Sequence, residues 1–194
     1  MNKHLNNYIY KVVLLFAATL SINFTNKIVY CVLSFTVLMC TLNAIAKHHG
    51  SKKATISIVC CTTLTFGLLY NKPYCIIPGK PISGLILASL CAVLMASYIG
   101  FKLFLKLETR YGFVVSNCIS LLIASLVDHL IMGIFFTNSF PMHRILLILF
   151  KETAYTYLFT SIIYLCSVAV SYAKPALMRL IKKILTAIGR YPAG

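Results

Sequence analysis

The chain has 194 residues, 60% of them hydrophobic, with a mean hydropathy of +0.88 and a formal net charge of +15. A soluble domain of this length cannot cover so much apolar surface, because its surface is too large relative to its volume. With only three acidic residues and no recognisable nucleophile–base arrangement, the chain lacks the parts of a hydrolytic enzyme. Composition therefore predicts one integral membrane domain over residues 1–194 that is not an enzyme and carries no cofactor.

Six apolar segments follow one another along the chain. They cover residues 8–24, 28–46, 54–70, 82–105, 112–136 and 145–172. A helix of about 20 apolar residues crosses about 30 Å of hydrocarbon, and the segments approach or exceed that length. The first segment contains Lys11, which lies near enough to one end to reach the membrane surface. The pattern predicts an all-α, polytopic membrane protein with six transmembrane helices.

Polar connectors and a basic tail separate and follow these segments. The connector KHHGSKK lies between the second and third segments, and NKPYCIIPGKP, with three prolines and a glycine, lies between the third and fourth. Residues 173–194 read AKPALMRLIKKILTAIGRYPAG, in which basic and apolar residues alternate irregularly. This composition predicts an amphipathic cytoplasmic tail able to lie on the membrane surface.

Basic residues divide unequally between the two ends of the predicted helices. Four lie on one side, Lys151 lies within the sixth segment, and the other thirteen of the 18 lie on the opposite side: Lys3, Lys11, Lys47, Lys52, Lys53, Lys102, Lys106, Arg110, Lys174, Arg179, Lys182, Lys183 and Arg190. Because basic loops stay in the cytoplasm, this split predicts cytoplasmic N- and C-termini in the cell (inner) membrane. Charge in short loops and tails also favours anionic lipid over nucleic acid as a partner.

The eight cysteines do not form a metal-binding pattern. Seven of them fall inside apolar segments, and no C-x-x-C pair occurs. A zinc site needs clustered thiols that can lose their protons, whereas a buried lone thiol behaves as a small apolar side chain. We therefore predict packing roles for the cysteines and no metal site.

Three ionisable residues fall inside the predicted spans: Asp128 in the fifth, and Lys151 and Glu152 in the sixth. Such groups are costly in hydrocarbon and commonly mark pathways or sites. At 1.5 Å per residue, Asp128 and Lys151 both lie about 10–12 Å below the outer surface, so they meet if the helix faces permit. A structural ion pair and a wall of a ligand or ion site both fit, and a third reading has Lys151 reaching the lipid surface. Glu152 lies about 100° further round its helix and faces a second partner or the cavity.

Uncharged polar side chains in the spans extend this candidate substrate-binding site. Those of interest are Asn23, Asn43, Ser97, Asn117, Ser120 and Ser125. A single Ser usually bonds its own helix backbone, whereas a buried Asn amide is more costly and therefore more informative. His129 is a weaker candidate as a proton partner of Asp128, because neighbours on a helix point apart. We place Asn23, Asn43, Ser120 and Ser125 in the site with the three ionisable residues.

Four stretches carry a resemblance to a known family: TLNAIAKHHGSKKA (41–54), ASLCAVLMASYIGFKLF (88–104), SNCISLLIASLVDHLIMGIFF (116–136) and LFKETAYTYLFTSIIYL (149–165). Together they are similar to the six-helix VUT-type queuosine precursor transporters, which take up 7-deazaguanines. The residues that match this family's usual types are Asn23, Gly50, Ser89, Ser120, Asp128 and Lys151. The chain departs from the family at five positions: Asn43 and Gly100 replace aspartates, Lys47 a glutamate, and Ser97 and Ser125 glutamines.

The resemblance implies import of a queuosine precursor, or a related nucleobase, across the inner membrane. A carboxylate such as Asp128 or Glu152 would accept ring N–H groups of a deazapurine-like substrate, and Lys151 or an Asn amide would donate to its carbonyl. The departures imply a different substrate, a rearranged site, or a lineage that is losing its transport activity. Two other functions stay open: a substrate-binding membrane subunit of a multi-component vitamin importer, and a structural membrane protein. A homo-oligomer also stays open.

Overall fold

The structure, a computed structural model, describes residues 3–24, 27–70, 84–137 and 140–187, with side chains described from residue 5 to residue 170. These residues form five helices: α1 (Lys3–Phe24), α2 (Ile28–His49), α3 (Ser51–Leu69), α4 (Leu85–Phe136) and α5 (Met142–Ala187). No strand occurs within the described ranges, and each helix contains a stretch long and apolar enough to cross a membrane. The all-α prediction is confirmed, with five helices rather than six. The predicted connector at 71–83 lies outside the described residues.

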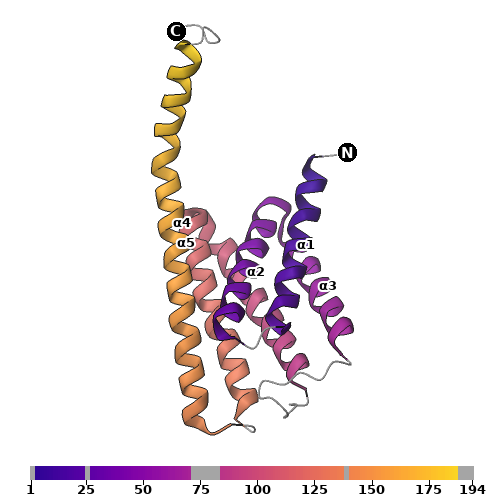
Figure 1. Ribbon diagram of the computed structural model, residues 1–194. Helices are drawn as coiled ribbons and strands as arrows, with labels where there is room; N and C mark the ends of the chain where they lie inside the picture. Colours follow the sequence, from indigo (N-terminus) through magenta and orange to yellow (C-terminus); the bar gives the residue numbers. More distant parts are fainter. Residues whose placement is uncertain (1–2, 25–26, 71–83, 138–139, 188–194) are drawn as a thin grey trace.

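Helix α4 is 52 residues long and is broken at Gly112, where φ is 74° and ψ is 173°. This left-handed conformation is one that L side chains rarely adopt, so the glycine permits a reversal that most residues would resist. Figure 1 shows the two halves of α4 (residues 85–111 and 113–136) running side by side in opposite directions. A Cβ placed on Gly100 would lie 2.7 Å from the Cβ of Ala124, which shows how closely the halves approach. The predicted fourth and fifth spans therefore correspond to the two halves of one broken helix.

Helix α2 lies at the centre of the bundle and packs against each of the other four helices. Half of its most apolar stretch is buried inside the protein, compared with 17% for α1 and 11% for α5. A helix that is apolar on all sides is typical of such a central position. The hydrophobic core is built from α1, α2, α3 and α4, with Leu38, Met39 and Leu42 of α2 fully buried.

The end of α2 adjoins the start of α3 and the break in α4. A single residue, Gly50 with φ of 88°, links α2 to α3, and its N–H donates to the carbonyl oxygen of Ala46. The Lys47 ammonium lies 2.8 Å from the Glu108 carboxylate and 5.0 Å from the centre of the Phe113 ring. The reversals at Gly50 and Gly112 therefore lie at the same end of the bundle. Six spans in chain order would place the connections after the second and fourth spans on the same side.

Helix α5 buries two threonines and exposes many of its large apolar side chains. Within the described side chains, its buried residues are Ile145, Thr156 and Thr160, whereas Phe150 is 73% exposed and Leu165 is 63% exposed. In water this arrangement would leave a large apolar face exposed, whereas lipid solvates such a face. The distribution supports a membrane environment for this helix.

The last span continues into the tail as one helix. The predicted amphipathic tail begins at residue 173, and α5 runs through that position without a break to Ala187, well past the other helices (Figure 1). The segment is rich in Ala, Leu and Lys, which favour helix, and its single internal proline at position 175 does not end the helix. The contact of this tail with the membrane surface remains a prediction.

Candidate functional site

The first of two polar groups in the bundle lies between α2 and the second half of α4. We call it the amide cluster: Cys40, Asn43, Asn117 and Ser120. The Asn43 amide nitrogen donates to Asn117 Oδ1 at 2.7 Å and to Ser120 Oγ at 2.9 Å. The Asn117 amide nitrogen in turn contacts the sulfur of Cys40 at 3.2 Å. Residues about 75 positions apart are thus joined by side-chain hydrogen bonds across the centre of the protein.

Asn43, like Ser120, is fully buried within the amide cluster. Its side chain is 0% exposed, and its Oδ1 atom has no hydrogen-bond partner among the described residues. An unpartnered buried amide oxygen costs about 1–3 kcal/mol, so native proteins usually satisfy such atoms with protein, water or ligand. The free oxygen is an acceptor that suits an N–H donor.

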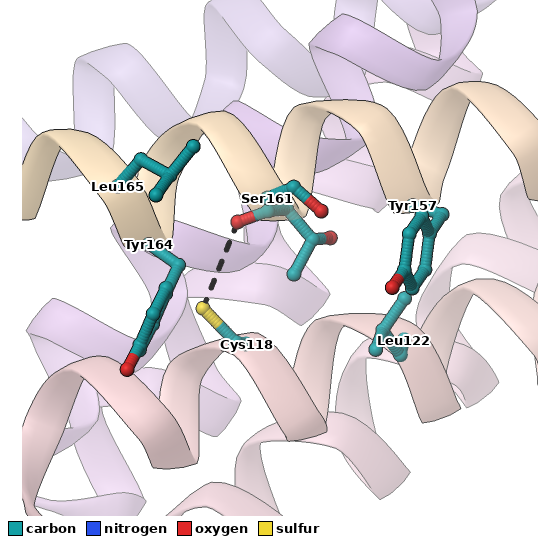
Figure 2. A pocket seen from close by; sticks show the side chains of 7 residues that line it. Cys118, Leu122, Tyr157, Ser161, Tyr164 and Leu165 are labelled. Carbon is teal, nitrogen blue, oxygen red and sulfur yellow. Dashed lines mark hydrogen bonds between the residues drawn. The ribbon is translucent and has the colours of Figure 1, made fainter.

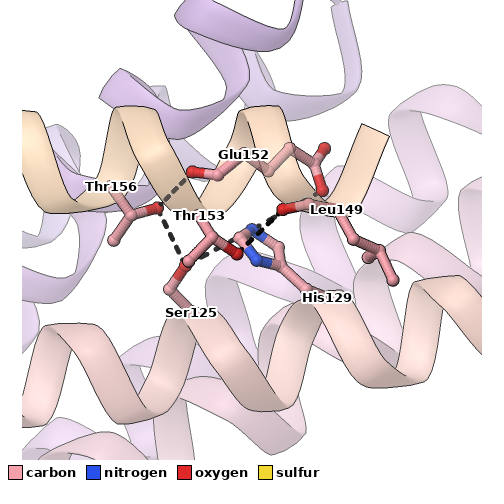
Figure 3. Close-up of polar contacts among 6 residues, drawn as sticks. All are labelled: Ser125, His129, Leu149, Glu152, Thr153 and Thr156. Atoms are coloured by element: carbon pink, nitrogen blue, oxygen red, sulfur yellow. Dashed lines mark hydrogen bonds and ion pairs between the residues drawn. The ribbon is translucent and has the colours of Figure 1, made fainter. Parts of the chain in front are cut away.

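The second polar group lies between the second half of α4 and α5. We call it the carboxyl–histidine cluster: Ser125, Asp128, His129, Glu152 and Thr156. Figure 3 shows all of these residues except Asp128. Ser125 Oγ lies 2.9 Å from Thr156 Oγ1 and 3.3 Å from His129 Nε2. The same imidazole nitrogen lies 3.6 Å from Glu152 Oε2. His129 is 7% exposed, so this imidazole is held almost entirely inside the protein.

Helical spacing explains why these side chains face one another. On α5, Glu152, Thr156 and Thr160 follow at intervals of four and therefore line one face of the helix. On α4, Ser125 and His129 are also four residues apart. Because the two segments run in opposite directions, His129 lies opposite Glu152, and Ser125 opposite Thr156. The pairing continues to the Cys118 thiol, which contacts the carbonyl oxygen of Thr160 at 3.9 Å.

The expected meeting of Asp128 with Lys151 does not occur. Lys151 is exposed on the outer face of α5, and no ion pair joins it to Asp128 in the part of the chain that the structure describes. The depth estimate used the rise along each helix but not the rotation about it. Because successive residues differ by about 100°, the position that turns Glu152 toward α4 turns Lys151 away from it. His129, predicted only as a weak proton partner of Asp128, lies 3.6 Å from the Glu152 carboxylate instead.

Asp128 stands at the edge of the carboxyl–histidine cluster. Its Oδ1 atom is buried without a hydrogen-bond partner, and its carboxyl group is close enough to Glu152 for the two to interact electrostatically. The thiol of Cys31, on α2, interacts electrostatically with both carboxyl groups. Two of the three acidic residues of the protein therefore lie in one place within the bundle.

An open groove of about 320 Å³ lies on the outer side of α4 and α5 (Figure 2). Its walls are mainly apolar or aromatic: Cys118, Leu122, Tyr157, Thr160, Ser161, Tyr164 and Leu165. Tyr157 is 67% exposed and Tyr164 is 44% exposed, so the groove opens toward the surroundings of the protein rather than into the bundle. An apolar recess in this position is typical of a lipid-facing surface.

The predicted site residues thus fall into three sets. Asn43 and Ser120 lie together in the amide cluster, and Ser125, Asp128 and Glu152 lie together in the carboxyl–histidine cluster. Lys151 is exposed. Asn23 belongs to neither cluster, because its amide bonds the carbonyl oxygen of Thr19 in its own helix.

Sequence reasoning left Asn117, His129 and Thr156 out of the site. The four-residue spacing from Ser125 to His129, and from Glu152 to Thr156, was the available signal for two of them. Asn117 carried no such signal, since its partner lies on a different helix.

Comparisons with known proteins add no further assignment. The chain matches no family model, no curated protein and no solved structure.

Proposed function

We propose that the protein is a six-span membrane transporter for a small, planar, nitrogen-rich molecule of the deazaguanine or nucleobase class. The observation that carries this proposal is the unpartnered Oδ1 of Asn43, a fully buried acceptor at the centre of a helical bundle. Ring N–H groups of a deazaguanine are suitable donors for such an oxygen. A few polar groups in a largely apolar surrounding are typical of selective small-molecule sites.

The resemblance to queuosine precursor transporters supports the same substrate class. In this proposal the amide cluster replaces part of the family's usual acidic contacts, because Asn43 stands in place of an aspartate. An amide both donates and accepts, whereas a carboxylate only accepts, so the position suits a neutral ligand. Asp128 would lie near the outer half of the pathway. The membrane is the cell inner membrane, with anionic lipid at the basic cytoplasmic loops.

We expect labelled 7-deazaguanine to accumulate in cells that produce this protein and lack their own uptake route. Excess unlabelled deazaguanine or guanine should compete, whereas an unrelated vitamin should not, because only purine-like edges match the buried amide. The measurement is initial uptake rate, with membrane insertion checked by immunoblot of the membrane fraction.

Other outcomes of this experiment favour the alternatives. Substrate that stabilises the purified protein against heat, without uptake unless an ATPase complex is present, would indicate the binding subunit of a multi-component importer. A well-inserted protein that neither binds nor transports any of these compounds would indicate a structural membrane protein and would overturn the proposal.

The six-span topology gives a second prediction. Reporters placed after Gly50, after Gly112 and at the C-terminus should all report the cytoplasm, whereas reporters after Lys27 and after Thr137 should report the opposite side. The reason is that Gly112 breaks α4 into two antiparallel halves, each of which crosses the membrane in this proposal. Paired fusions with green fluorescent protein and alkaline phosphatase measure the side directly. Phosphatase activity after Gly112 would contradict the arrangement.

A further inference from the structure

The carboxyl–histidine cluster holds a buried imidazole next to a carboxylate, an arrangement that substrate binding does not need. His129 Nε2 lies between a hydroxyl oxygen, Ser125 Oγ at 3.3 Å, and a carboxylate oxygen, Glu152 Oε2 at 3.6 Å (Figure 3). The other ring nitrogen, Nδ1, is buried and has no hydrogen-bond partner among the described residues. An imidazole arranged in this way has one nitrogen committed to the cluster and one nitrogen available.

Inside a membrane, the protonation state of the His129–Glu152 pair decides whether the protein interior carries a net charge. When Glu152 is ionised and His129 is neutral, the pair carries one negative charge, and an isolated charge in hydrocarbon is costly. One added proton makes the pair neutral overall, either as carboxylate with imidazolium or as carboxylic acid with imidazole. Protons come from water and return to it, so no other reactant is required. Proton uptake therefore removes a net charge from the interior of the protein.

Titratable groups on α4 and α2 lie within electrostatic range of the pair. On α4 the neighbour is Asp128, whose carboxyl group interacts with Glu152. From α2, the thiol of Cys31 interacts with both carboxyl groups. Lys151 of α5 is exposed on the opposite side and supplies no compensating ion pair to these carboxyls in the described structure. No lysine or arginine ion pair to either carboxyl is present there, so a proton is the simplest source of positive charge.

We propose that His129 and Glu152 form a proton-binding site which takes up one proton as the transporter opens to one side and releases it on the other. Proton binding stands on the geometry of the cluster alone, whereas coupling to substrate movement rests on the proposed function. A proton suits this site better than a metal ion or sodium. No group of three or more His, Cys, Asp or Glu side chains is placed to hold a metal within the described residues, and sodium prefers oxygen ligands to an imidazole nitrogen.

The binding of the proton can be tested without any substrate. In protein reconstituted into liposomes, infrared spectra should show either the carbonyl stretch of a protonated carboxyl group or the ring bands of an imidazolium, and this component should disappear as the pH rises. Glu152→Gln should abolish that titrating component, and His129→Gln should shift the pH at which it titrates. Glu108→Gln is the matched control, because Glu108 pairs with Lys47 at the end of the bundle and not with the cluster. A component that persists in Glu152→Gln but is lost in Asp128→Asn would overturn the assignment.

Variants that unfold are identified by size-exclusion profile before the spectra are recorded. If Glu152→Gln does not fold, Ser125→Ala tests the site instead. This substitution removes the hydroxyl beside His129 Nε2 and should change the pH at which the infrared component titrates. A spectrum identical to that of the unmodified protein would count against the site.

Coupling is tested in the same liposomes with an internal pH-sensitive dye. Adding 7-deazaguanine outside should acidify the interior at a rate that Glu152→Gln reduces to that of protein-free liposomes, while Glu108→Gln leaves it unchanged. Uptake without acidification, or uptake that follows a sodium gradient, would overturn the coupling but leave the proposed function intact. A titrating Glu152 with no deazaguanine uptake would support the proton site and count against the proposed substrate.

Discussion

Gly100→Ala should lower the free energy of unfolding by about 1–3 kcal/mol, the cost of forcing an extra methyl group into a packed core. The added Cβ would lie 2.7 Å from Ala124 Cβ and 3.3 Å from the carbonyl oxygen of Ser120, and it would overlap the end of the Met39 side chain. Met39 can rotate away, but the Ala124 and Ser120 atoms are fixed to the helix backbone. The two halves of α4 would therefore have to separate. The midpoint of thermal unfolding in detergent measures the loss.

Gly67→Ala is the matched control for this substitution. Gly67 lies in α3, and a Cβ built there meets no atom within 4 Å. Alanine also favours helix over glycine, by about 1 kcal/mol in soluble helices, so this variant should be neutral or more stable. Equal unfolding midpoints for the two variants would show that the halves of α4 do not pack as closely as described.

The crowding at Gly100 also affects the family comparison made from the sequence. In the queuosine precursor transporters to which we propose this chain is related, an aspartate is usual at that position. Here the space such a side chain would need is occupied by Met39 and Ala124. In our proposal, a helix–helix contact stands where these transporters have a polar side chain, and substrate is recognised by Asn43 and the residues bonded to it.

Much of the fold was predictable because lipid imposes a simple length rule. Apolar segments long enough to cross hydrocarbon predicted the helices to within a few residues at most ends, and the polar stretch KLETRYG correctly predicted the reversal that occurs at Gly112. The continuation of α5 to Ala187 was not predicted, because the change from apolar to basic composition at residue 173 alters the environment of the helix but not its hydrogen bonding.

For the candidate site, the level of each residue along its helix was predictable, but the face of the helix on which it lies was not. Counting residues along each helix placed Asp128, Lys151 and Glu152 at similar levels, and Asp128 and Glu152 do lie together. The pairing with Lys151 was wrong, because level alone does not determine which face a residue occupies. The partnership of Asn43 with Asn117 depends on how two distant helices rotate against each other. The sequence of one segment does not determine how that helix rotates against another, so this contact is seen only in the packed structure.

Asn43→Ala should destabilise the protein by about 1–3 kcal/mol and abolish binding of 7-deazaguanine. The substitution removes two hydrogen bonds between helices, each worth about 0.6–1.7 kcal/mol in membrane proteins, and leaves Asn117 Oδ1 without its donor. It also removes the one acceptor on which the proposed function depends. Thermal unfolding in detergent, with and without ligand, measures both effects in one experiment.

Asn23→Ala is the control that distinguishes a general effect of losing a buried amide from a specific effect of losing the Asn43 amide. Asn23 is also buried, at 5% exposed, but among the described residues its amide bonds only the carbonyl oxygen of Thr19 in the same helix. Its removal should cost less stability and leave the ligand-induced shift of the unfolding midpoint intact. Where Asn43→Ala is too unstable to purify, Ser120→Ala removes one acceptor of the Asn43 amide and should weaken binding while the fold persists. Equal ligand shifts in the Asn23, Asn43 and Ser120 variants would exclude the amide cluster as the binding site, because a ligand that contacts Asn43 Oδ1 cannot be indifferent to its loss.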